Sequence, residues 1–97
     1  MAVVKLYGEE YQLSFDNKYK ANNQPVLEIT DSGGIPSGVI SVCIASHEFG
    51  ENETAICSDV DQASIVEQLV KQGVAVSQGK LATSGYGRYP IVKILKN

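Results

Sequence analysis

His47 is the only histidine in this chain of 97 residues and the first candidate for chemistry. It lies beside Glu48 and near Glu51 in the segment HEFGE, a combination that suggests acid–base catalysis or metal binding. One histidine and two carboxylates on a single loop fall short of a defined metal-ligand set. We therefore predict a solvated loop histidine. The alternative is a small hydrolase or transferase that uses His47 with Glu48 or Glu51.

Cys43 and Cys57 are the only cysteines, and both lie within apolar stretches. They lack the close CxxC spacing of a zinc or redox site. In a chain without a secretion signal, such residues are more often free and buried than joined in a disulfide. We predict two free thiols.

The remaining polar motifs also have structural explanations. Asp59 and Asp61 precede a helical pattern, where a carboxylate caps exposed N–H groups. The glycine-rich segments SGGIPSG and SGYGR lack the Gly-Lys-Ser/Thr of a phosphate-binding loop and the GxGxxG of a dinucleotide site. No GxSxG nucleophile elbow is present. We predict no catalytic residue, no bound metal and no cofactor, and hence a protein that is not an enzyme.

The segment SGYGRYP combines two glycines, two tyrosines, the only arginine and a proline just before the last apolar run. Tyrosine and arginine are enriched at binding hot spots, and shaped loops on rigid sheets often carry binding residues. We predict a shaped loop that enters a strand, with Tyr86 and Arg88 projecting. Pro90 has no N–H, so the strand should be paired on only one side there. The predicted binding residues are Gly85, Tyr86, Gly87, Arg88 and Tyr89.

Charge and composition limit the classes of partner that the protein is expected to bind. The net charge is −3, with eight basic and eleven acidic residues, whereas nucleic-acid binding depends mainly on clustered Lys and Arg. The one locally basic stretch is thin and consists of Lys80, Arg88, Lys93 and Lys96. We therefore do not expect nucleic acid as the partner, and weak nucleic-acid binding remains an alternative. The opening MAVVKLYGEE has no basic leader and no long apolar stretch, so we expect a cytoplasmic protein without a membrane span.

Hydrophobic periodicity predicts the elements. Ile65, Val66, Leu69 and Val70 form one apolar stripe at helical spacing, which predicts a helix over Asp61 to Gln72. Strands are expected at VVKLY, YQLSF, VLEIT, VISVCIA, TAICS and YPIVKILK, with VISVCIA as a central strand covered on both faces. The residues before the last strand, VAVSQGKLATSGYGRYP, are predicted to be a long connection.

The coarse order is β-β-β-β-β-α-β in a single domain, residues 1–97. The fold class is therefore α+β, with a mostly antiparallel sheet of about five to six strands and one helix packed on one face. The predicted core residues are Leu13, Phe15, Leu27, Ile29, Ile40, Val42, Ile44, Ile56, Ile65, Leu69, Val92 and Ile94.

The segments VKLYGEEYQLSF, ENETAICSD and SGYGRYPIVKI resemble a family of short proteins of about this length from Gram-positive gut bacteria. Its members are often encoded on conjugative elements and prophages, and no activity is established for them. The resemblance implies a mobile-element protein that acts on a host or rival defence system, and it supplies no catalytic residues. With the motifs above, it predicts a small module that binds an unidentified protein partner. A housekeeping domain that forms a homodimer through a sheet edge is the alternative.

Overall fold

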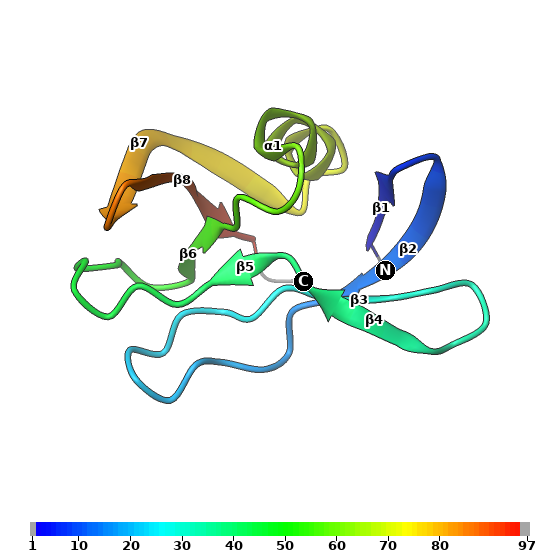
Figure 1. Ribbon diagram of the computed structural model, residues 1–97, viewed down its shortest axis with the longest axis horizontal. Coiled ribbons are helices and arrows are strands. Elements are labelled where there is room, and N and C mark those ends of the chain that lie inside the picture. Colours follow the sequence, from blue (N-terminus) through cyan, green and yellow to red (C-terminus); the bar gives the residue numbers. More distant parts are fainter. Residues whose placement is uncertain (1, 96–97) are drawn as a thin grey trace.

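The structure, a computed structural model, describes residues 2–95. In chain order it contains β1 (Ala2–Leu6), β2 (Glu9–Ser14), β3 (Glu28–Thr30), β4 (Pro36–Val39), β5 (Ser41–Val42), β6 (Glu53–Ile56), α1 (Gln62–Lys71), β7 (Ala75–Ser84) and β8 (Gly87–Ile94). The strands form two four-stranded sheets, in the orders β1-β2-β3-β4 and β5-β6-β8-β7, and neighbouring strands are antiparallel (Figure 1). The predicted α+β class with one helix is confirmed, but the strands are divided between two sheets.

The division occurs within the apolar run VISVCIA. Ile40 is buried between β4 and β5: its N–H donates to the Leu27 carbonyl at 2.9 Å, and its own carbonyl accepts from the Cys57 N–H at 2.9 Å. One residue thus continues the ladder of the first sheet on one side and that of the second sheet on the other. The prediction of a single central strand was wrong, because Val39 ends the edge strand β4 of one sheet and Ser41 begins the edge strand β5 of the other.

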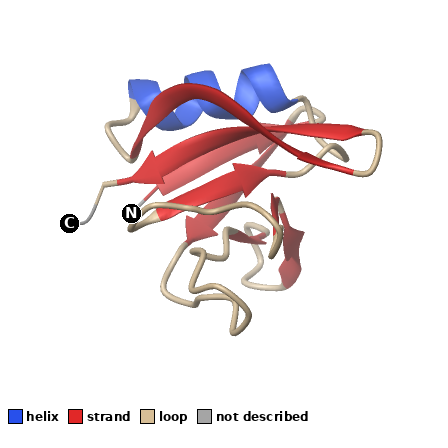
Figure 2. Ribbon diagram, turned by 90° about the vertical axis from the view of Figure 1, so that its left-hand side faces the viewer, coloured by secondary structure: helices blue, strands red, loops and turns tan. Residues whose placement is uncertain are grey.

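Helix α1 matches the predicted range. Asp61 is its N-cap and accepts from the Ser64 N–H at 3.1 Å, which satisfies one of the free donors of the first turn. Ile65 and Leu69 are fully buried, and the helix lies over the long strands β7 and β8 (Figure 2). Within the described residues, no helix is long and apolar enough to cross a membrane.

The free edge of β1 is closed by two glutamines of α1. Gln72 accepts from the Val3 N–H at 3.1 Å and donates to the Val3 carbonyl at 2.5 Å. One turn earlier, Gln68 accepts from the Lys5 N–H at 2.7 Å and donates to the Lys5 carbonyl at 3.0 Å. The two side-chain amides therefore pair with the edge as a neighbouring strand would, and they join the helix to the first sheet.

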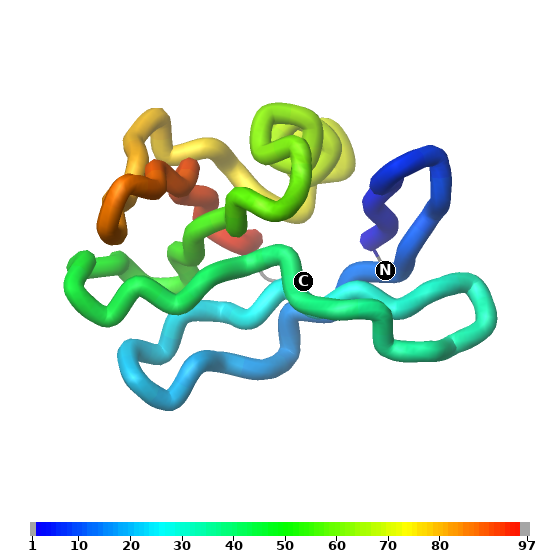
Figure 3. Tube along the Cα trace, in the orientation of Figure 1, coloured from blue at the N-terminus to red at the C-terminus, as the bar shows by residue number. Residues whose placement is uncertain are grey.

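A third glutamine fills the space along β5. The Gln24 side chain is buried, donates to the Val42 carbonyl at 2.8 Å and accepts from the Ile44 N–H at 2.8 Å. Its Nε2 also lies 3.0 Å from the Thr54 hydroxyl. Figure 3 shows this segment (light blue) passing beside β5 (green). The amide thus satisfies polar groups that no neighbouring strand reaches.

The core consists of two clusters. The larger cluster fills the space between α1 and the two sheets, and the smaller one contains Ile44, Ala55, Ala82 and Ile91, with Phe49 and Tyr89 packed against it. Of the predicted core residues, all are buried except Phe15 and Val42, which are half-buried and pack against these clusters. The smaller cluster supports the β7–β8 hairpin.

Candidate interaction site

The predicted loop SGYGRYP is the end of a β-hairpin. Ser84 at the end of β7 pairs with Gly87 at the start of β8, which leaves Gly85 and Tyr86 as a two-residue turn. Gly85 has a φ of 60°, and Tyr86 is not among the residues with positive φ. Glycine at the first central position is typical of a type II′ turn, whose twist matches that of the flanking strands. The segment predicted as a shaped loop is therefore a tight, regular turn.

The hairpin extends beyond the rest of its sheet. β6 pairs with β8 only from Ile91 to Lys93, whereas β7 pairs with β8 as far as Gly87. Pro90 thus pairs with β7 alone, as expected for a residue without an N–H. We call residues 81–90 the arm; it lies at the left of Figure 1, away from the sheet β1–β4.

Side chains alternate along a strand, so the arm has two faces. Directly opposed residues of an antiparallel pair share a face. The pairs Ala82–Tyr89 and Ser84–Gly87 therefore form the inner face, and the pairs Leu81–Pro90 and Thr83–Arg88 form the outer face. Ala82 is buried in the smaller core cluster, which places the inner face against the protein.

Tyr89 anchors the inner face. Its ring packs against the smaller cluster and lies over Gly87, where a Cβ would collide with the Tyr89 hydroxyl. Gly87 therefore makes room for an aromatic side chain two residues further along the strand. Two of the predicted binding residues, Gly87 and Tyr89, therefore lie on the inner face and support the arm.

The outer face and the tip carry the exposed side chains. Tyr86 is fully exposed at the tip, Arg88 is exposed beside it, and Leu81 is 52% exposed. Tyr86 and Arg88 both project as predicted, and Leu81 and Thr83, which the sequence prediction missed, are exposed with them. The alternation of Leu81 and Thr83 with Ala82 was the available signal, but this segment was expected to be a connection.

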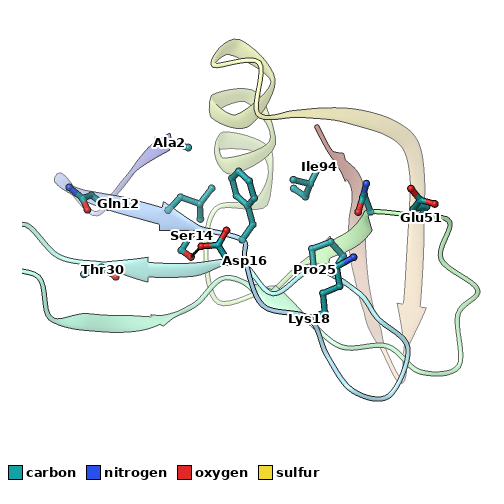
Figure 4. Close-up of a pocket in the computed structure, with 12 residues that line it drawn as sticks. Ala2, Gln12, Ser14, Asp16, Lys18, Pro25, Thr30, Glu51 and Ile94 are labelled. Carbon is teal, nitrogen blue, oxygen red and sulfur yellow. Dashed lines mark hydrogen bonds between the residues drawn. The ribbon is translucent and has the colours of Figure 1, made fainter. Parts of the chain in front are cut away.

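A groove lies at the other end of β8 from the arm, between Ile94 and strand β2 of the first sheet. It has a volume of about 720 Å³, with Leu13, Phe15 and Ile94 among its apolar lining residues. Figure 4 shows Asp16, Lys18 and Glu51 around it, with Ser14 bonded to Asp16 at 3.4 Å. This groove was not predicted from the sequence. Its lining mixes apolar and charged residues without a convergent set of polar groups, which is what a specific small-molecule site needs.

A smaller hollow of about 270 Å³ is lined by acidic side chains and Tyr11. Desolvation raises the pKa of the Tyr11 phenol, and the Glu9 carboxylate, 3.3 Å from its hydroxyl, adds to the rise. A tyrosine phenol is protonated at neutral pH even without this rise, and the Tyr11 hydroxyl donates to the Glu9 carboxylate.

His47 is less exposed than predicted. Its Nε2 is buried without a hydrogen-bond partner among the described residues, and its ring centroid lies 4.6 Å from that of Phe49 at an interplanar angle of 63°. The prediction of a solvated histidine was therefore wrong, because edge-on packing against Phe49 covers the ring. Within residues 2–95, no group of three His, Cys, Asp or Glu side chains is placed to hold a metal ion. Cys43 and Cys57 are free, as predicted.

Comparison with known proteins gives no relative from which to transfer a function. No protein-family model, curated protein or solved structure matches the chain.

Proposed function

We propose that this chain is a non-catalytic protein-binding module that contacts its partner through the tip and outer face of the arm. The observation that carries the proposal is the full exposure of Tyr86 beside Arg88 at the end of a regular hairpin. A large aromatic side chain with no packing role in its own fold is available to fill a pocket on another protein.

The arm is built to present these side chains with little loss of entropy on binding. The type II′ turn fixes the tip, Tyr89 and Ala82 hold the inner face, and the Gln62 side chain donates to the Arg88 carbonyl at 3.2 Å. A preorganised surface avoids part of the ordering cost that a flexible loop would incur on association.

We further propose a biological setting. The resemblance of VKLYGEEYQLSF, ENETAICSD and SGYGRYPIVKI to short proteins of conjugative elements and prophages suggests a mobile-element protein. Such a protein, working in the cytoplasm, would bind and block a component of a host or rival defence system.

The arrangement of the basic residues argues against nucleic acid as the partner. Arg88 and Lys93 are five residues apart on one strand, so they point to opposite faces in a regular strand. Lys80 lies 3.7 Å from the Glu53 carboxylate, which offsets its charge. Lys96 lies outside the described residues. The basic side chains therefore do not form one phosphate-binding face.

The proposal predicts that Tyr86→Ala combined with Arg88→Ala abolishes partner capture. Both side chains are exposed, so we expect the melting temperature to stay nearly unchanged. The measurement is affinity purification from the native host followed by mass spectrometry, with wild type and variant processed in parallel.

Ile35→Ala combined with Lys20→Ala is a matched control, because it also removes one exposed apolar side chain and one exposed cation, but on other loops. The control should capture the same partner as wild type. Equal capture by the arm variant would show that the arm is only scaffold.

A further inference from the structure

The sheet edges of this protein are not equally available. Gln68 and Gln72 occupy the β1 edge, and Gln24 occupies the β5 edge. The β4 edge is exposed, but it contains Pro36, and its pairing with β3 is irregular. Proline and irregular pairing are common means by which proteins discourage the addition of another strand. The remaining edge belongs to β7.

The β7 edge has an interrupted part and a regular part. A bulge lies between Ser77 and Leu81, and Gly79 within it has a φ of 66°. From Leu81 to Ser84 the strand is paired in continuous register with β8. The regular part therefore coincides with the arm.

The outward-facing backbone groups on this edge follow from the pairing pattern. The Arg88 carbonyl bonds to Gln62, so it points away from β7. Arg88 and its partner Thr83 are thus a non-hydrogen-bonded pair, and Thr83 directs its N–H and C=O away from β8. By the same alternation, Leu81 also directs its N–H and C=O away from β8. Within the described residues, no hydrogen bond to another segment uses these outward-facing N–H and C=O groups.

The arm itself carries no acidic side chain. Residues 68–97 contain five of the eight basic residues and none of the eleven acidic ones. On the arm Arg88 is the one charged residue, whereas Lys80, which directly precedes Leu81, is paired with the Glu53 carboxylate at 3.7 Å. An added strand would therefore meet two unpaired backbone positions, the exposed Leu81 and the positively charged Arg88.

We infer that the partner contributes an extended, acidic segment that pairs with β7 at Leu81 and Thr83. This inference rests on the proposed function and names the kind of partner that the arm binds. Backbone hydrogen bonds provide affinity in such strand addition, while Leu81 and Arg88 select an apolar and an acidic side chain.

Two other occupants fit the edge less well. A second copy of this chain would bring a second arm that also lacks acidic side chains, so nothing in it would face Arg88 with the opposite charge. Nucleic acid would face the acidic remainder of the chain, since residues 1–67 contain eleven acidic and three basic residues. An acidic polypeptide segment, unlike nucleic acid, also carries the backbone N–H and C=O groups with which Leu81 and Thr83 can pair.

Thr83→Pro tests the inference, with Thr83→Ala as its control. Proline removes the outward N–H without removing a β7–β8 hydrogen bond, whereas alanine keeps that N–H. The probe is a displayed library of random linear peptides, selected on the full-length wild-type protein. We expect selected peptides to be rich in Asp and Glu, to bind Thr83→Ala as they bind wild type, and to bind Thr83→Pro at least about tenfold more weakly.

Several results would overturn strand addition: selection that enriches no peptide, peptides without acidic residues, or equal binding to Thr83→Pro and Thr83→Ala. Arm-dependent self-association in sedimentation, or binding of single-stranded oligothymidylate that Arg88→Ala removes, would assign the edge to another occupant.

Circular dichroism of Thr83→Pro checks that the variant folds. If the variant does not fold, Arg88→Glu must weaken peptide binding, or the inference fails. If the Tyr86 and Arg88 double variant loses its native partner while Thr83→Pro keeps it, the proposed function stands and strand addition does not.

Discussion

Leu69→Ala is expected to lower the free energy of unfolding by about 2–5 kcal/mol, the range observed when a buried leucine is truncated. Leu69 has no exposed surface and belongs to the larger core cluster, where α1 meets both sheets. The truncation leaves a cavity that the surrounding strands cannot readily fill, because they are fixed by their ladders. Urea denaturation, followed by circular dichroism, measures the change.

Val70→Ala is the matched control on the same helix. Val70 is 43% exposed, so its truncation should change the free energy of unfolding by no more than about 0.5 kcal/mol. A loss below about 0.5 kcal/mol for Leu69→Ala would contradict the docking of α1 through Ile65 and Leu69.

Gln24→Leu should destabilise the protein by about 2–4 kcal/mol, although it replaces a polar side chain with an apolar one of similar size. The Gln24 amide is 1% exposed and bonds to the Val42 carbonyl, the Ile44 N–H and the Thr54 hydroxyl. Leucine would leave these buried groups without partners, and the desolvation cost outweighs the added apolar contact. The same urea titration measures the loss.

Gln12→Leu makes the same chemical change at an exposed position on β2 and should be nearly neutral. If Gln24→Leu were as stable as wild type, the Gln24 amide would not be the group that completes the β5 edge.

The elements with strong periodicity were predictable from the sequence. The helix from Asp61 to Gln72, its aspartate cap and nearly all of the core follow from the spacing of apolar residues. These features depend on local preferences and on burial of one face, which a sequence pattern records directly.

The second sheet was harder to predict because its long strand β7 is exposed along most of its length. An edge strand with a bulge at Gly79 needs few apolar residues, so AVSQGKLATS lacks the usual alternation. The break at Ile40 was hidden for the opposite reason. An unbroken apolar run is equally compatible with one central strand and with two edge strands that share a buried junction.

The residue types of the candidate site were predictable, but their geometry was not. The sequence singled out Tyr86 and Arg88, and the structure places both at the exposed end of the arm. The Tyr89 side chain lies over Gly87, and this contact depends on the conformation of the strand and not on a local sequence pattern. The glutamine side chains that bond to the edges of β1 and β5 join residues as far as 69 positions apart, and no local sequence pattern predicts such contacts.

Hydrogen–deuterium exchange of the chain, alone and in complex with its captured partner, tests most directly whether the arm is the binding surface. The account predicts that peptides covering residues 81–90 become protected in the complex, because the exposed edge and the tip are covered there. Unchanged exchange in the arm, together with new protection at Leu13, Phe15 and Ile94, would place the partner in the groove and contradict the account.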